Sequence, residues 1–156
     1  MGKILRIGLD FDNTIARYGK LFEKIAIQEK IIKNKIKINN KDIIRKQILK
    51  QKNGKHKWMR LQGLVYGKYM KNADLYPGLV NFLYACKLRE CEIFIVSHKT
   101  EHGHFDKDKI SLRKQALKWM KSKDFFDTSL ININIKNIFF ANTQDQKNRI
   151  YIRFKT

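Results

Sequence analysis

Three short apolar runs, two of which stop abruptly at a polar residue, constrain the fold of this chain most. Residues 3–9 (KILRIGL) stop at Asp10, residues 92–96 (EIFIV) stop at Ser97, and residues 137–140 (NIFF) form the third run. Runs of this length are typical of buried strands in a parallel sheet. Helical patterns lie on both sides of the second run, so the sequence predicts alternating strands and helices.

The segment between the first two runs has a different, helical period. Apolar residues recur every three to four positions from Leu21 to Ile32, and Ile36 extends the same stripe. Asn40 is suited to cap a second helix over about residues 41–50. The pair Asn53-Gly54 is a turn signal, and we expect a third helix after it.

These patterns predict the domain organisation. We expect an α/β, Rossmann-like three-layer domain built from residues 1–19 and 75–156, with its parallel sheet covered by helices over about 79–89 and 109–122. Residues 20–74 form a helical insertion after the first strand. A chain of 156 residues is long enough for one such domain with a buried core.

The chain carries a formal net charge of +20, from 34 basic and 14 acidic residues. The densest basic stretch runs from Lys30 to Lys57, and Trp58 at its end is the one aromatic residue placed to stack on a base. A solvated lysine face on amphipathic helices is the favoured interpretation, with a nucleic-acid surface as the alternative. In either case the positive charge attracts anionic substrates such as phosphate esters.

Two carboxylates follow the first apolar run at positions i and i+2. Burying Asp10 and Asp12 together is costly unless a cation neutralises them. Mg²⁺ is a natural counter-ion, because it takes one or two carboxylates together with water and phosphate oxygens. The simpler alternative is a turn in which Asp12, Asn13 and Thr14 only tie down the backbone.

The stretch GLDFDNTI, residues 8–15, resembles the first signature motif of the haloacid-dehalogenase-like (HAD) hydrolase superfamily, hydrophobic-DxDxT. The family's second motif is a Ser or Thr that ends the next core strand, and Ser97 matches it. Its third motif is a Lys after the third strand, and Lys147 fits. The resemblance covers nearly the whole chain and implies that residues 20–74 are the family's helical cap.

The resemblance implies a Mg²⁺-dependent phosphatase that hydrolyses a small phosphomonoester. It assigns Asp10 as the nucleophile, which forms an aspartyl-phosphate. Asp12 would protonate the leaving alkoxide and then activate water. Asp10, through its side chain, and Asp12, through its backbone carbonyl, would hold the metal.

Further residues receive supporting roles from the same resemblance. Ser97 would hydrogen-bond a phosphoryl oxygen, and Lys147 would neutralise developing negative charge. Thr14 would brace the loop at the substrate site. His98 and Lys99, next to Ser97, are expected to contact the substrate.

One family feature is missing from the sequence. The fourth motif, an acidic group at the end of a fourth strand, has no counterpart in the nine residues after Lys147. We therefore expect a shortened member with a weakly held metal and an uncovered edge on the first strand. Residues 150–154 could pair with that edge as a strand, or a second copy could cover it in a homodimer. A helix end after Lys147 is the alternative for these residues.

The polar stretch over residues 98–108 contains three histidines, His98, His102 and His104, beside several acids. This composition could indicate zinc, but without a helix to fix the spacing we favour a solvated loop.

We also expect a cytoplasmic protein. The N-terminal apolar run reaches an acid after only a few residues, so we expect no signal peptide. No stretch approaches the length of a membrane span, and two cysteines do not make a disulfide framework.

Overall fold

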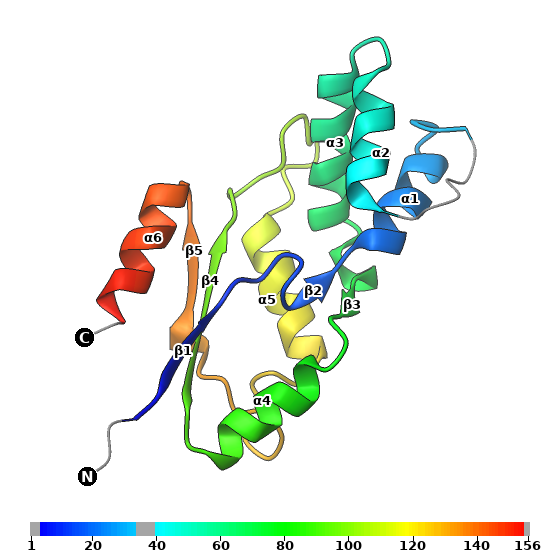
Figure 1. Cartoon of the computed structure of the whole chain (residues 1–156). Coiled ribbons are helices and arrows are strands. Elements are labelled where there is room, and N and C mark those ends of the chain that lie inside the picture. Colours follow the sequence, from blue (N-terminus) through cyan, green and yellow to red (C-terminus); the bar gives the residue numbers. More distant parts are fainter. Residues whose placement is uncertain (1–3, 34–39, 155–156) are drawn as a thin grey trace. The chain divides into compact units, whose positions relative to one another are not determined.

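The computed structural model describes residues 4–33 and 40–154, and the chain divides into two compact units (Figure 1). The first, here called the sheet unit, comprises Met1–Arg17, Leu75–Thr100 and Leu117–Thr156. The second, the helical unit, comprises Tyr18–Asp74 and Glu101–Ala116. Two very short strands, β2 (Ala16–Arg17) and β3 (Asp74–Leu75), pair where the chain passes between the units.

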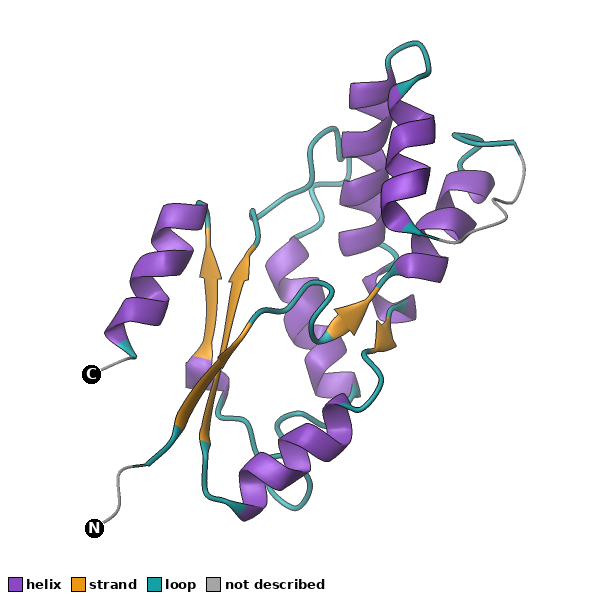
Figure 2. Cartoon of the chain, viewed as in Figure 1, coloured by secondary structure: helices purple, strands orange, loops and turns teal. Residues whose placement is uncertain are grey.

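The sheet unit is built on three parallel strands (Figure 2). They are β1 (Arg6–Leu9), β4 (Glu92–His98) and β5 (Ile138–Ala141), in the order β1-β4-β5. Leu9 registers with Ile95, and Ile95 registers with Ile138. The prediction of an α/β fold with a parallel sheet from the three apolar runs is confirmed, and the arrangement is compatible with a Rossmann-like fold.

The strand β1 is an edge of this sheet among the described residues, because its one neighbour is β4. An open strand edge presents unpaired N–H and C=O groups that another chain can pair with. A homodimer that covers this edge stays a prediction.

Three helices contribute to the sheet unit. They are α4 (Leu79–Leu88), the C-terminal half of α5 (Leu112–Ser122) and α6 (Gln144–Arg153). Helix α4 buries Leu79 and Leu83, as its period predicts, but Phe82 is 42% exposed although the sequence places it on the same face. The buried stripe is therefore narrower than the pattern of apolar residues indicates.

Of the two alternatives for the residues after Lys147, the helix end is confirmed by α6, and pairing of residues 150–154 with β1 as a strand is wrong. Two side chains cap the start of α6: the Thr143 side chain accepts from the Gln146 amide at 3.2 Å, and Gln146 Oε1 accepts from the Asn142 amide at 2.8 Å. Helix α6 lies beside β4 and β5 (Figure 1). Its Tyr151 ring rests directly on Gly8 of β1.

The helical unit contains α1 (Gly19–Gln28), α2 (Lys41–Leu49), α3 (Gly54–Tyr66) and a short 3₁₀ turn, η1 (Met70–Asn72). Asn40 caps α2 as predicted, because its side chain accepts a hydrogen bond from the Asp42 amide at 2.8 Å. The longest described helix, α3, has 13 residues. No helix in the described part of the chain combines the length and apolar character needed to cross a membrane.

Helix α1 ends earlier than its apolar stripe predicts. The helix stops at Gln28, and Lys30 takes a left-handed conformation with φ 54°. The amides of Ile31 and Ile32 then turn back to the Ala26 carbonyl, so both side chains remain buried after the helix has ended. A tight turn, and not a longer helix, therefore buries the last residues of the apolar stripe. The predicted helical position of Ile36 lies outside the described residues.

The contact between Gly8 and Tyr151 generates a first prediction. A Cβ at Gly8 would lie 2.6 Å from Tyr151 Cε1, so Gly8→Ala must displace the Tyr151 ring or the helix that carries it. We expect Gly8→Ala to cost about 1–3 kcal/mol of unfolding free energy, measured by urea denaturation. In a Tyr151→Ala background the same substitution should cost much less, whereas strictly additive losses would contradict the contact.

Candidate functional site

The turn after β1 places two carboxylates at the carboxyl end of the sheet. Phe11, between them in sequence, is fully buried and meets the Trp119 ring edge-on at 5.6 Å. The amides of Ile15 and Ala16 both donate to the Phe11 carbonyl at 3.0 Å, which closes the turn. Burial of Phe11 therefore fixes where its two acidic neighbours lie.

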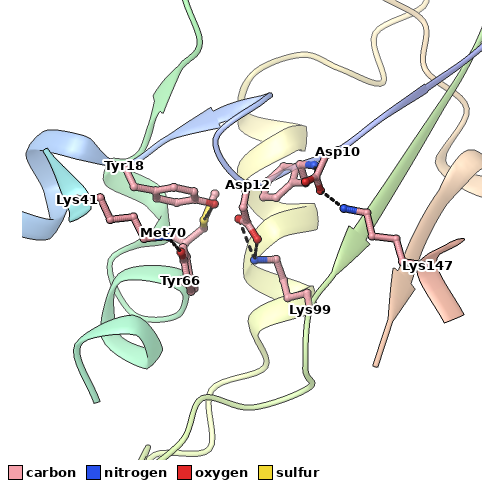
Figure 3. A network of polar contacts seen from close by, with 9 residues as sticks. Asp10, Asp12, Tyr18, Lys41, Tyr66, Met70, Lys99 and Lys147 are labelled. Carbon is pink, nitrogen blue, oxygen red and sulfur yellow. Dashed lines mark hydrogen bonds and ion pairs between the residues drawn. The ribbon is translucent and has the colours of Figure 1, made fainter. Parts of the chain in front are cut away.

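Asp10 forms an ion pair with Lys147 (Figure 3). Lys147 Nζ lies 2.7 Å from Asp10 Oδ1, which also accepts from the Phe11 amide at 2.8 Å. The Lys147 side chain is 9% exposed and the Asp10 side chain 43% exposed. Two residues predicted for the site from distant parts of the sequence are thus in contact, with one Asp10 edge open to solvent.

Asp12 is held by a second lysine, Lys99, whose Nζ donates to both carboxylate oxygens at 3.0 and 3.1 Å (Figure 3). The Lys99 side chain is only 2% exposed, and its ammonium also lies 5.4 Å from the centre of the Phe11 ring. Sequence reasoning offered Lys99 only as a substrate contact beside Ser97. Nothing in the sequence distinguishes it from the other lysines, because its partner is 87 positions away.

Ser97 lies on β4 at the same end of the sheet and is fully buried. Its Oγ has no hydrogen-bond partner among the described residues. Leaving a buried hydroxyl unsatisfied costs about 1–3 kcal/mol, so an acceptor that reached it would be bound favourably. Because the Oγ is covered, a ligand oxygen reaches it only when the covering side chains move aside.

Thr14 and His98 are two further residues that the sequence predicts for the site. The Thr14 side chain is exposed, and its hydroxyl makes no hydrogen bond within the described part of the chain, so backbone bonds close the turn instead. His98 Nε2 lies 2.9 Å from the Asn142 carbonyl. Since a carbonyl only accepts, Nε2 carries the proton, and the ring joins the ends of β4 and β5.

Tyr151 is a residue near Asp10 that sequence reasoning did not assign. Burial raises the pKa of its hydroxyl, and the negative charge of Asp10 raises it further. The hydroxyl is therefore protonated at neutral pH and lies 3.5 Å from the Val96 carbonyl. Its spacing of four residues from Lys147 on α6 places both side chains on the same helix face.

Formal charges cancel at this end of the sheet, since two carboxylates are paired with two ammonium groups. No group of three or more His, Cys, Asp or Glu side chains is gathered anywhere in residues 4–33 and 40–154. The oxygen atoms here that could ligate a metal ion are those of Asp10 and Asp12, and the Asp10 side chain is open to solvent. Lys147 and Lys99 therefore take the counter-ion role that the sequence predicts for Mg²⁺, and of the two carboxylates, the open oxygen of Asp10 is the position left for a metal ion.

Trp58, the candidate base-stacking residue at the end of the basic segment, is buried in the helical unit. Trp58 is 6% exposed and stacks on Phe22 with ring centres 5.3 Å apart. Lys41 donates to the Tyr66 hydroxyl at 2.9 Å (Figure 3). Its ammonium also lies 5.2 Å from the centre of the Phe22 ring. Trp58 belongs to the packed core of the unit and Lys41 is half-buried beside it, whereas Lys46 and Lys50 are exposed.

In the loop that follows β4, the Asp106 carboxylate is hydrogen-bonded to backbone amides of the same loop. Asp106 accepts from the amides of Asp108 and Ile110 at 3.1 and 2.7 Å. This use of the carboxylate is typical of a turn-forming Asp.

The sequence matches none of the protein-family models, and no curated protein matches it.

The buried Lys99 generates a second prediction, about stability. Asp12→Ala leaves the Lys99 ammonium buried without its carboxylate, and we expect a loss of about 3–5 kcal/mol in unfolding free energy. Lys99→Met should cost less, because Asp12 is 21% exposed and water can solvate it. The double variant should be more stable than Asp12→Ala alone, as measured by urea denaturation.

An exposed ion pair provides the control for this series. Arg6 and Glu92 lie 3.1 Å apart with side chains 46% and 39% exposed. Breaking such a pair with Arg6→Ala should cost about 0–1 kcal/mol. Equal losses for Arg6→Ala and Asp12→Ala would contradict the description of the Lys99 pair.

Proposed function

We propose that the chain is a HAD-like phosphatase that hydrolyses a small phosphomonoester through an aspartyl-phosphate. The observation that carries this proposal is the 2.7 Å pair between Asp10 and Lys147 at the carboxyl end of β1. A carboxylate with one open edge beside a buried ammonium suits attack on a phosphorus atom. Ligands of parallel sheets bind at this end of the strands.

In the first step, a carboxylate oxygen of Asp10 attacks phosphorus, and the bond to the ester oxygen breaks. The leaving alkoxide takes a proton from Asp12, while the phosphoryl group stays on Asp10. Lys147 offsets negative charge on the phosphoryl oxygens, and Ser97 Oγ donates to one of them. Once Asp12 has given up its proton, its carboxylate accepts from Lys99 at both oxygens.

In the second step, Asp12 takes a proton from water, and the resulting hydroxide attacks the phosphorus of the aspartyl-phosphate. The bond between phosphorus and Asp10 breaks, inorganic phosphate leaves, and Asp12 has regained its proton. Bound Mg²⁺, held by Asp10 and the Asp12 carbonyl, would supply further neutralisation of phosphate charge.

We further propose that the helical unit corresponds to the family's cap and selects the substrate. Its α1, α2 and α3 follow β1 in the chain, where the HAD family places such an insertion. A basic protein attracts phosphate esters, and this supports an anionic substrate.

A nucleic-acid-binding module is the competing function. Exposed lysines such as Lys46 and Lys50 favour it, whereas burial of Trp58 removes its stacking residue. Binding to nucleic acid would fall steeply with salt, in proportion to the phosphates neutralised. Salt-sensitive binding without any hydrolysis of phosphomonoesters would favour this function over the phosphatase.

A phosphatase assay over a panel of sugar phosphates and nucleotides tests the proposal, with Mg²⁺ and after EDTA treatment. We expect Mg²⁺-dependent release of phosphate, which Asp10→Asn abolishes because the nucleophile is lost. Asp12→Asn should lower kcat about 10²–10⁴-fold, as expected for loss of a general acid and base.

Asp145→Asn provides the control for these variants, because Asp145 is an exposed carboxylate in the first turn of α6. It should retain the activity of the unmodified chain. Activity that survives Asp10→Asn, with the variant folded as judged by circular dichroism, would contradict the proposed nucleophile.

A further inference from the structure

The helical unit contains a pocket of about 780 Å³. One wall is a row of side chains at four-residue spacing, His56, Arg60, Leu64 and Lys68, along α3 and just beyond its end. The opposite wall is the loop around Phe105, and all of these residues belong to the helical unit. The volume lies within the range of small-molecule sites.

The loop is fixed against α3 by a contact between two glycines. A Cβ at Gly103 would lie 2.6 Å from the Cα of Gly63, so neither position has room for a larger residue without movement. The hydrogen bonds from the amides of Asp108 and Ile110 to Asp106 then hold the following turn. The wall of the pocket is therefore a defined surface, set by backbone packing.

Phe105 is in a costly conformation within this loop. Its φ is 60°, a left-handed value that bulky residues rarely adopt, and its side chain is 53% exposed. The ring lies against His56 with ring centres 3.8 Å apart. Strained residues of this kind cluster at ligand-binding sites, and an exposed aromatic face in a pocket offers a stacking surface.

Charged groups surround this aromatic pair. Arg60 donates to Glu29 at 2.7 Å, and Glu29 is 20% exposed. Lys68 and Lys107 are exposed cations on opposite walls of the pocket. The pocket thus offers an aromatic face, carboxylate acceptors and two ammonium donors.

We propose that this pocket binds a nucleoside monophosphate, with the base on Phe105 and the phosphate between Lys68 and Lys107. The flat ring of a base matches the exposed aromatic face, and its exocyclic amine can donate to a carboxylate such as that of Glu29. The phosphate matches the two ammonium groups. This inference does not rest on the proposed phosphatase function, because all the residues it uses lie in the helical unit.

The test is a titration of the full chain with AMP, followed by nuclear magnetic resonance of the backbone amides. We expect the largest shifts in residues 56–68 and 103–108. Adenosine, which lacks the phosphate, and ribose 5-phosphate, which lacks the base, should each bind at least tenfold more weakly. Shifts confined to residues near Asp10 would overturn the proposal.

Variants separate binding from folding. Phe105→Ala should weaken AMP binding at least tenfold, while Phe82→Ala, at an exposed Phe of α4, should leave it unchanged. Phe105→Gly should lose binding without a lower melting temperature, because glycine adopts positive φ freely. Unchanged AMP affinity in both Phe105 variants would overturn the proposal.

The Asp10→Asn chain distinguishes this proposal from the phosphatase. It should bind AMP as tightly as the unmodified chain even though any turnover is lost. If phosphatase activity is absent but AMP binding depends on Phe105, the pocket stands and the proposed enzyme fails. AMP affinity that falls with Asp10→Asn but not with Phe105→Ala would place the ligand at Asp10 and overturn the pocket.

Discussion

Neutralisation of two acids by two lysines is the interaction on which the sheet unit depends. Asp10 and Asp12 flank the buried Phe11, so both acids are drawn toward the protein interior with it. The charges that are buried here are the two ammonium groups, since the Lys147 and Lys99 side chains are 9% and 2% exposed, and buried charges are tolerated only when they are paired. Asp10 and Asp12 provide that pairing to lysines from α6 and from the end of β4, and the pairs connect three distant segments of the chain.

The strands and most helices could be predicted because their signals are local. Apolar runs mark β1, β4 and β5, and Asn40 marks the start of α2. The capping residues Thr143 and Gln146 were also present in the sequence, but the alternating residues after them suggested a strand. The capped helix forms, and its two capping side chains satisfy the amides of Gln146 and Asn142.

The candidate site was predictable only in part. Asp10 and Lys147 could be paired from motif positions, but the partner of Asp12 could not, because a lysine's burial depends on non-local packing. Assignment of Glu101–Ala116 to the helical unit had no sequence signal either. Its close approach to α3 is a backbone contact between Gly63 and Gly103, and glycine alone specifies no partner.

Helix α6 has a consequence for the order of folding. Lys147 reaches Asp10 and Tyr151 rests on Gly8, so α6 contacts both β1 and the turn that follows it, more than 130 positions earlier in the sequence. Contacts between such distant positions close late, since a long loop must be ordered first. During synthesis, β1 and its acids therefore leave the ribosome long before α6 does. Until α6 docks, the nascent chain presents an uncovered strand face, and exposed strands of this kind make folding intermediates prone to aggregation.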